Sequence, residues 1–309
     1  MVDTIFRTIV PIFLLIGTGF LSRRLGVLKS GDERVLSAYV YYFALPALFL
    51  VTMDEVVFTS EILLFISAGM APILAPVTAY TALYLLLRFT KTTLYLLILS
   101  TCFGSYAFFG IPFITFAFPA EGERLATLAA ASISIVSVTI SLTILELYRL
   151  KEPSKLQGLK SVAKSFSKNP LIISIFSGTL LSLAGIRLPI PLSTSLHLLG
   201  GTTSAVAIFM LGVFLYGRRY TNLASAFKLS LLRIIFLPVI ALLIARTVGL
   251  TGVEGSVLVL MHGMPVAISM IVLSERYDFC KETIATLILV SSVGAAVYLN
   301  MWLLLLGQY

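Results

Sequence analysis

The segments FFGIPF at residues 108–113 and MHGMPV at residues 261–266 each carry the tripeptide Gly-x-Pro inside a long apolar stretch. Proline deprives a helix of one backbone hydrogen bond and clashes with the preceding turn, and glycine weakens the helix further. We therefore expect a helix to break in mid-membrane at each Gly-x-Pro. The alternative is that the prolines only kink packed helices, but the recurrence of the motif favours a pair of breaks.

Long apolar stretches follow one another along the whole chain. Of its 309 residues, 59% are hydrophobic and only 12% are charged, and the mean hydropathy is +1.04. Such a chain has too little polar surface to cover a water-soluble globule. A helix needs about 20 apolar residues to cross a bilayer, and we identify ten stretches of suitable length. They lie at 5–22, 35–53, 62–88, 94–118, 124–148, 169–185, 191–216, 229–249, 254–274 and 283–307. The predicted fold class is therefore an all-α membrane protein with ten transmembrane helices.

Lysine and arginine are distributed unevenly among the loops. Of the 22 basic residues, 17 precede the second, fourth, sixth, eighth or tenth stretch, whereas Arg124, Arg187 and Arg246 lie in the opposite loops. By the positive-inside rule, the basic loops face the cytoplasm and both termini lie outside, in a multi-pass protein of the cell membrane. The longest loop, 150–168, is basic and amphipathic, and we expect it to lie along the cytoplasmic membrane face. The net charge of +8 thus reflects topology and contact with the lipid bilayer, and we expect no nucleic-acid partner.

Three sequence matches relate the first half of the chain to the second. Gly26 and Gly185 are 159 residues apart, and so are the Ala-Thr-Leu segments at 126–128 and 285–287. The two Gly-x-Pro motifs are 153 residues apart, which requires a length change of six residues. Five spans in each half would invert the second copy in the membrane, and inverted repeats are typical of secondary transporters. The predicted repeats are 1–153 and 154–309.

Half-helix N-termini beside a membrane break present free N–H groups and positive dipole ends, which favour an anion. We therefore predict a substrate site at the two breaks. Its predicted residues are Ser105, Tyr106, Gly110, Pro112, His262, Gly263, Pro265 and Ser269. Serine can equally satisfy its own helix backbone, and a structural role for His262 is at least as common as anion or proton binding. Arg233 lies one turn inside the eighth stretch, where we expect it to snorkel to the cytoplasmic surface, with anion attraction as its alternative.

Other kinds of chemistry have little support in the sequence. Only two cysteines occur, Cys102 inside an apolar stretch and Cys280 in a loop, so we expect neither a disulfide framework nor a cysteine-rich metal site. We predict no metal, no cofactor and no catalytic residue. Acidic residues are almost absent from the middle of the stretches, which argues against a carboxylate relay for cations. Ser105 and His262 would be nucleophile and base of an intramembrane hydrolase, the enzyme class that we keep as an alternative.

Seven segments along the chain resemble the auxin efflux carrier family. They are YFALPALFL at 42–50, FFGIPF at 108–113, SKNPLIISIFSG at 167–178, LAGIRLP at 183–189, FMLGVFLYG at 209–217, LPVIALLIA at 237–245 and HGMPVAISMIVLSERYD at 262–278. The resemblance implies the larger bile-acid-symporter-like fold, in which the fourth and ninth of ten helices are broken and cross. It also implies a scaffold domain and a transport domain, each drawn from both halves, an elevator-type carrier of organic anions such as auxins or dicarboxylates, and a homodimer.

Within this resemblance, Pro112 and Pro265 match the family crossover, and Ser105 matches by position a residue that is Asn in many relatives. Plant relatives have a second proline where this chain has Ser269, and these departures argue against auxin itself. His262 matches no family pattern. The predicted function is a secondary transporter of small organic anions or carboxylates. The alternatives are a sodium-coupled organic-anion symporter, a non-transporting receptor and the hydrolase.

Overall fold

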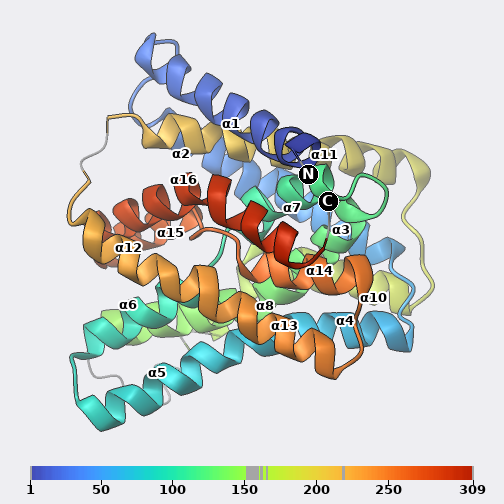
Figure 1. The fold of residues 1–309 in the computed structure, drawn as a ribbon. Coiled ribbons are helices and arrows are strands. Elements are labelled where there is room, and N and C mark those ends of the chain that lie inside the picture. The colour runs from blue at the N-terminus through green and yellow to red at the C-terminus, as the bar shows by residue number, and fades with distance from the viewer. Residues whose placement is uncertain (1, 151–159, 161–162, 165, 218–219, 308–309) are drawn as a thin grey trace.

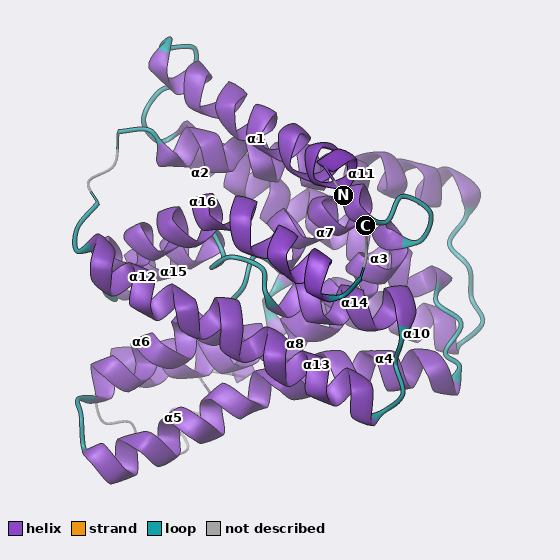
Figure 2. Ribbon diagram, viewed as in Figure 1, coloured by secondary structure: helices purple, strands orange, loops and turns teal. Residues whose placement is uncertain are grey.

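The computed structural model describes residues 2–150, 160, 163–164, 166–217 and 220–307. Over these residues the chain consists of helices joined by turns and short loops (Figure 2). The described part contains no β-strand beyond one isolated antiparallel bridge between Gly104 and Val266. The all-α prediction is thus confirmed. The linker predicted at 150–168 lies largely outside the described residues.

Several helices follow one another directly, separated only by a short 3-10 or π-helical turn (Figure 1). In chain order the elements are α1 (Val2–Arg24), α2 (Asp32–Tyr39), the π-helical turn η1 (Val40–Ala44), α3 (Leu45–Glu55), α4 (Ser60–Met70), the 3-10 turn η2 (Ala71–Ile73), α5 (Leu74–Leu87), α6 (Lys91–Cys102), the π-helical turn η3 (Tyr106–Gly110), α7 (Ile111–Ala117), α8 (Gly122–Leu150), α10 (Pro170–Leu183), α11 (Ile190–Leu215), α12 (Leu223–Leu231), the π-helical turn η4 (Leu232–Phe236), α13 (Leu237–Thr247), α14 (Gly252–His262), α15 (Ser269–Tyr277) and α16 (Lys281–Leu305). Each predicted apolar stretch coincides with one of these elements or with several in succession.

Six continuous helical stretches are long and apolar enough to cross a membrane. They are Asp32–Glu55, Ser60–Leu87, Gly122–Arg149, Ile190–Leu215, Leu223–Thr247 and Lys281–Leu305. Three shorter apolar helices, Tyr106–Ala117, Pro170–Leu183 and Gly252–His262, accompany them. The chain therefore has the build of a multi-pass membrane protein. The number of ten spans and the inverted halves stay predictions.

Each of the three π-helical turns ends two residues before a proline. The turns η1, η3 and η4 end at Ala44, Gly110 and Phe236, and the prolines that follow are Pro46, Pro112 and Pro238. A proline ring clashes with the carbonyl four residues earlier, and a widened turn moves that carbonyl out of the way. The helix therefore continues past each of these prolines.

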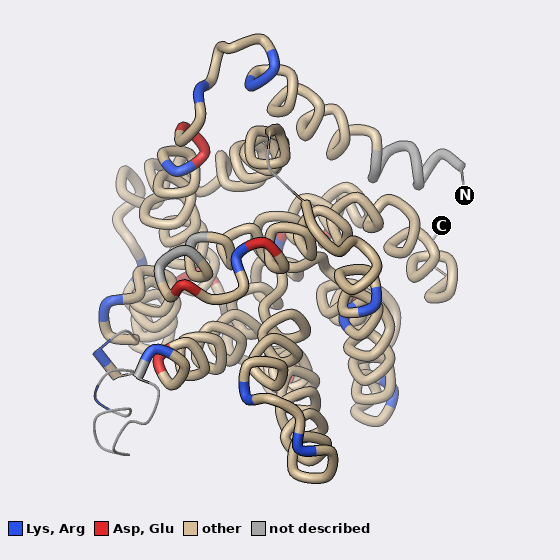
Figure 3. Tube along the Cα trace, turned by 90° about the vertical axis from the view of Figure 1, so that its left-hand side faces the viewer, with Lys and Arg blue, Asp and Glu red and all other residues tan. Residues whose placement is uncertain are grey.

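Basic residues gather at one end of the molecule. The C-terminal end of α1 and the N-terminal ends of α6, α12 and α16 lie at the left of Figure 1, the end that Figure 3 turns toward the viewer. Arg23 and Arg24 lie in the last turn of α1, while Lys91 and Lys281 begin α6 and α16. The cytoplasmic position of the basic end, with both termini outside, stays a prediction.

Helices α1 and α11 approach closely because glycines face their contact from both sides. A Cβ atom on Gly212 would lie 1.9 Å from the carbonyl oxygen of Ile16, and one on Gly19 would lie 2.0 Å from that of Phe209. Without side chains at these positions the two backbones pack directly, which is a common means of helix association in membranes. This contact joins α1 to a group in which α3 packs on both α10 and α11.

We expect Gly212→Ala to destabilise the protein by about 1–3 kcal/mol, because the new methyl group would overlap the backbone of α1. Gly201→Ala is the matched control, since Gly201 lies in the same helix and a Cβ atom there meets nothing within 4 Å. This control should be neutral or stabilise the protein by up to about 1 kcal/mol. Thermal unfolding of the detergent-solubilised variants measures both effects. Equal melting temperatures of the two variants would contradict the packing role of Gly212.

Candidate functional site

Two helices are interrupted in the buried interior of the molecule. Helix α6 ends at Cys102, and the helical path resumes at Tyr106. Helix α14 ends at His262, and the helical path resumes at Ser269. We call the intervening residues 103–105 and 263–268 the crossing.

The two segments of the crossing pair with each other. The Ser105 N–H donates to the Pro265 carbonyl at 2.8 Å. The Ala267 N–H donates to the Phe103 carbonyl at 3.1 Å, and these bonds flank the bridge between the segments. Backbone polar groups in an apolar interior must be bonded within the protein. The pairing therefore replaces helical hydrogen bonds that the interruptions remove.

The first interruption lies earlier in the chain than predicted. Gly110 and Pro112 do not open a break, because Gly110 ends the turn η3 and Pro112 lies in the first turn of α7. The physical reason is the widened turn, in which the Phe109 and Gly110 N–H groups both donate to the Ser105 carbonyl. This geometry lets the helix continue past the proline ring.

Gly104 is the glycine at the first interruption. It lies 159 residues before Gly263, which is the separation of the other two sequence matches. The length change of six residues is therefore not needed to bring the two interruptions into register. Gly263 and Pro265 do lie at the second interruption, where α14 ends.

The side chain of Arg233 contacts the end of α6 and the crossing segment that follows α14. It is fully buried, with 0% of its surface exposed. Its Nε donates to the Met264 carbonyl, and its Nη1 donates to the Thr101 carbonyl in the last turn of α6. Its guanidinium carbon lies 5.1 Å from the centre of the Tyr106 ring. A single cation from the eighth apolar stretch thus satisfies carbonyls on both sides of the crossing.

Arg233 also lies directly against the backbone at Gly104. A Cβ atom on Gly104 would lie 1.6 Å from Nη2 of Arg233, so that only glycine leaves room for the guanidinium. Within the described residues, Nη2 has no hydrogen-bond partner and Arg233 forms no ion pair. The expectation that Arg233 snorkels to the surface is therefore wrong. Burial of a cation costs several kcal/mol, and here backbone carbonyls offset that cost.

Other polar side chains satisfy the remaining carbonyls near the crossing. The Cys102 carbonyl, at the end of α6, accepts from the Tyr106 hydroxyl at 2.7 Å and from Ser137 Oγ at 2.8 Å. His262 Nε2 donates to the Gly69 carbonyl at 2.9 Å, beside the 3-10 turn η2. These bonds give His262 and the Tyr106 hydroxyl a structural role, because helix ends in an apolar interior need such partners.

The turn that carries Arg233 is bound from helix α16. Pro238 offers no N–H to the Ile234 carbonyl four residues earlier. The indole Nε1–H of Trp302 donates to that carbonyl at 2.9 Å instead. Trp302 is the only tryptophan of the chain.

A cavity of about 540 Å³ lies beside the crossing, a volume within the range of small-molecule sites. Its walls come from α2 and η1, from residues 103–108, and from α8, α15 and the start of α10. The polar residues in its lining are Arg34, Ser37, Tyr41, Tyr42, Ser105, Tyr106, Ser134, Ser137, Asn169 and Ser269. Because Arg34 is exposed, the cavity reaches the surface near the start of α2.

The structure brings only part of the predicted set to the cavity. Ser105, Tyr106 and Ser269 line it. The predicted residues outside its lining are Gly110, Pro112, His262, Gly263 and Pro265. Ser105 stands out because its buried Oγ has no hydrogen-bond partner in the described part of the chain. An unsatisfied buried hydroxyl costs about 1–3 kcal/mol, and a bound ligand that accepts its hydrogen bond would recover that energy.

Several lining residues were missed by sequence reasoning. Asn169 is the N-cap of α10, and its Oδ1 accepts from the Leu171 N–H at 3.0 Å and the Ile172 N–H at 3.4 Å. Tyr41 and Tyr42 pack edge to face, with their ring centres 5.0 Å apart. The Asn-Pro pair after a basic loop was a visible signal for Asn169. Nothing in the local sequence places the tyrosines at the crossing, because the cavity forms between distant segments.

The geometry does not support a hydrolase. Ser105 Oγ and His262 Nδ1 each lack a hydrogen-bond partner among the described residues, and His262 Nε2 is bonded to the Gly69 carbonyl. A nucleophile and its base must lie within hydrogen-bond reach of each other. In the same part of the chain, no group of three or more His, Cys, Asp or Glu side chains lies close enough to hold a metal ion.

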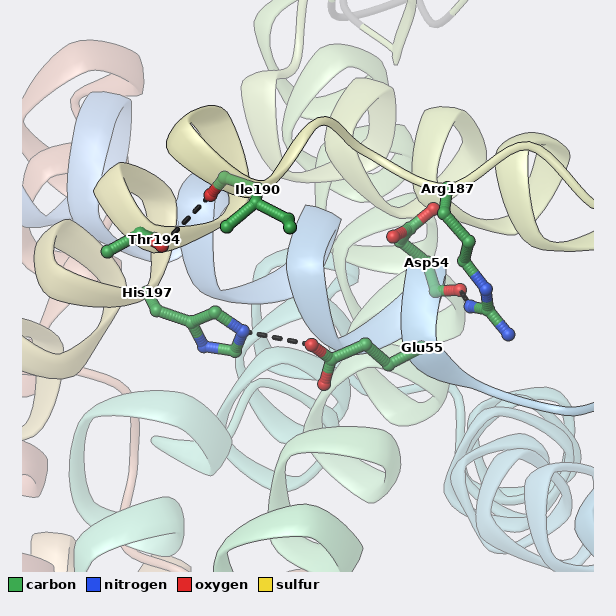
Figure 4. Close-up of polar contacts among 6 residues, drawn as sticks. All are labelled: Asp54, Glu55, Arg187, Ile190, Thr194 and His197. Atoms are coloured by element: carbon green, nitrogen blue, oxygen red, sulfur yellow. Dashed lines mark hydrogen bonds and ion pairs between the residues drawn. The ribbon is translucent and has the colours of Figure 1, made fainter.

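A separate polar cluster lies away from the crossing, where α3 ends and α11 begins (Figure 4). His197 Nε2 and Glu55 Oε1 are 2.9 Å apart, and both side chains are about half exposed, so this pair contributes at most about 1 kcal/mol. Arg187 donates to the backbone carbonyl of Asp54. None of these residues lines the cavity. The cluster therefore links the end of α3 to α11 and to the loop before α11, and it does not contribute to the site.

Comparison with known proteins gives matches along nearly the whole chain. The family model described as membrane transport protein matches residues 4–303. The uncharacterized transporter YfdV of Escherichia coli K12 is 25% identical over 306 residues, which cover 96% of this chain and 95% of that protein. The uncharacterized transporter MJ1031 of Methanocaldococcus jannaschii is 25% identical over 304 residues, which cover 94% of this chain and 95% of that protein.

We expect Gly104→Ala to destabilise the protein by about 1–3 kcal/mol, because the methyl group would displace the guanidinium of Arg233 from the crossing. Gly294→Ala in α16 is the control, since the nearest atoms to its Cβ would be those of the Tyr298 ring at 3.6 Å. Thermal unfolding in detergent measures the difference. If Gly104→Ala melts at the temperature of the control, the close approach of Arg233 to Gly104 is refuted.

Proposed function

This chain belongs to the family of membrane transport proteins, and on that premise we propose that it is a secondary carrier of small organic anions, carboxylates above all. The family match also confirms the resemblance to auxin efflux carriers. The observation that carries the proposal is that the cavity lies at the turns where η3 and α15 begin, whereas Arg233 lies at the carbonyl ends of the interrupted helices.

The electrostatics of this arrangement favour an anion. Residues 105–108 at the start of η3, and Ala267 and Ser269 at the start of α15, line the cavity. Helix N-termini carry a positive partial charge, and C-termini carry a negative one. The negative ends of α6 and α14 lie next to Arg233, whose cation compensates them. The positive ends thus face the cavity, and no Asp or Glu of the described residues lines it.

The cavity offers hydrogen-bond donors suited to a carboxylate. Ser105 Oγ is buried and has no hydrogen-bond partner among the described residues. Ser269, which begins α15 after the other interruption, also lines the cavity. Tyr41 and Tyr42 add hydroxyl groups on rings that can cover an apolar part of the substrate. At the exposed end, Arg34 forms part of the lining. Size and polarity therefore suit a small organic acid.

The position of the cavity also suits a carrier. On one side α2 and η1 belong to the group of helices that includes α3, α10 and α11. On the other, the helices of the crossing pack on α8. We extend the proposal to an elevator-type mechanism, in which a rigid-body shift between these two groups exposes the substrate to alternate sides of the cell membrane. The scaffold would be the first group, and the transport domain would be the second.

Sodium-coupled symport is the alternative that the sequence left open. Transporters with discontinuous helices bind coupling cations through carbonyls at helix ends and in unwound segments. Here two such carbonyls, of Thr101 and Met264, already accept hydrogen bonds from Arg233. A fixed positive charge at that place repels a second cation. This argument supports transport that does not depend on sodium.

Labelled uptake into proteoliposomes tests the proposed function. We expect saturable uptake of at least one member of a panel of mono- and dicarboxylates, at the same initial rate when sodium chloride is replaced by choline chloride. Empty liposomes provide the control. Uptake that stops without sodium would favour the symporter, and silence across the panel would contradict an anion carrier and favour a receptor.

We expect Ser105→Ala to raise the KM for the transported carboxylate by about tenfold to a hundredfold, the effect of losing one hydrogen bond to a charged group. Its melting temperature should not fall, because the Ser105 hydroxyl has no hydrogen-bond partner among the described residues. Ser141→Ala is the control, since Ser141 Oγ is likewise buried and unpartnered but does not line the cavity. An unchanged KM in Ser105→Ala would remove Ser105 from the binding site.

A further inference from the structure

We infer that Arg233 determines the charge selectivity of the carrier without touching the substrate. The inference rests on the proposed function, and it assigns the preference for anions to one residue outside the cavity lining. The guanidinium of Arg233 is fully buried and binds the carbonyls of Thr101 and Met264. It also lies against Gly104, which lines the cavity.

The guanidinium of Arg233 lies close to the cavity wall. Gly104 and Tyr106 both line the cavity. Nη2 of Arg233 lies 1.6 Å from the position of a Cβ atom on Gly104, and the guanidinium carbon lies 5.1 Å from the centre of the Tyr106 ring. Only one layer of backbone and one aromatic ring therefore separate the cation from the substrate space. In an interior of low dielectric constant, a charge acts across such a layer.

The charge of Arg233 is not neutralised by a carboxylate of the described residues. Nε and Nη1 of Arg233 bind carbonyls, which carry partial charges only, and Nη2 has no partner among the described residues. No carboxylate in that part of the chain forms an ion pair with it. The cation cancels the negative ends of α6 and α14. Without it, those ends would offset the positive ends that face the cavity.

A structural role of Arg233 and a role in setting the field of the cavity predict different effects of its replacement. If Arg233 only satisfied the Thr101 and Met264 carbonyls, its replacement would lower the uptake of every substrate alike. If it sets the field in the cavity, its replacement weakens the binding of charged substrates and leaves neutral analogues of the same shape unaffected. A charge series of one molecular skeleton distinguishes these outcomes.

The experiment measures KM and maximal uptake rate for succinate, succinamate and succinamide in proteoliposomes. The wild-type protein should take up the two anions at lower KM than the neutral diamide. In Arg233→Gln, the KM for succinamate should rise by roughly tenfold to a hundredfold, the effect of two unit charges within about 10 Å at an effective dielectric constant of about 20. The KM for succinamide should stay unchanged, and Arg233→Lys should retain most of the anion preference.

Arg187→Gln is the matched control, because Arg187 also donates to a backbone carbonyl, that of Asp54, but lies away from the cavity. It should behave as the wild type. If Arg233→Gln does not fold, Arg233→Met replaces it, and loss of folding in both variants would overturn the inference in favour of a structural role. A folded neutral variant with the wild-type ratio of KM values would also overturn it. Equal uptake of all three compounds by the wild type would instead refute the proposed function. If the wild type does not take up succinate, the charge series is built on the carboxylate that the panel identifies.

Discussion

Backbone hydrogen bonding in an apolar medium is the constraint on which this structure depends. Each interrupted helix leaves carbonyl and N–H groups that lipid and hydrocarbon side chains do not satisfy. Antiparallel pairing of the two short segments satisfies some of these groups, and side chains such as Arg233, Tyr106 and Ser137 satisfy others. The polar side chains of the interior are therefore concentrated where helices stop. A substrate site can form there with few additional polar groups.

The same arrangement separates the two kinds of helix end. Carbonyl ends meet a permanent cation on one side, while the amide ends of η3 and α15 border a cavity on the other. Under the proposed function, stability and substrate preference share one residue, because the guanidinium that makes an interrupted helix tolerable would also determine the sign of the field next to it. Gly104 is necessary for this arrangement, because the absence of a side chain there leaves room for the guanidinium next to the cavity wall.

The sequence predicted those features that depend on local chemistry. Apolar stretches coincide with helices because a run of about 20 apolar residues forms a membrane-spanning helix irrespective of the segments that it packs on. Gly263 and Pro265 were predicted at an interruption and lie there. Pro112 was not predicted correctly, because a π-helical turn absorbs its clash, and no rule of composition reveals that turn in advance. Arg233 was also misplaced, because its partners lie in distant segments and exist only after folding.

The bond from Trp302 to the Ile234 carbonyl has an optical consequence. Indole emission depends on the polarity and hydrogen bonding around the ring, and this chain has no other tryptophan. Fluorescence excited at wavelengths that tyrosine does not absorb therefore comes from Trp302 alone and reports on the turn η4, which carries Arg233. The unlabelled protein carries an intrinsic spectroscopic reporter beside its crossing, and its emission spectrum is a direct record of how that turn is solvated in each state of the protein.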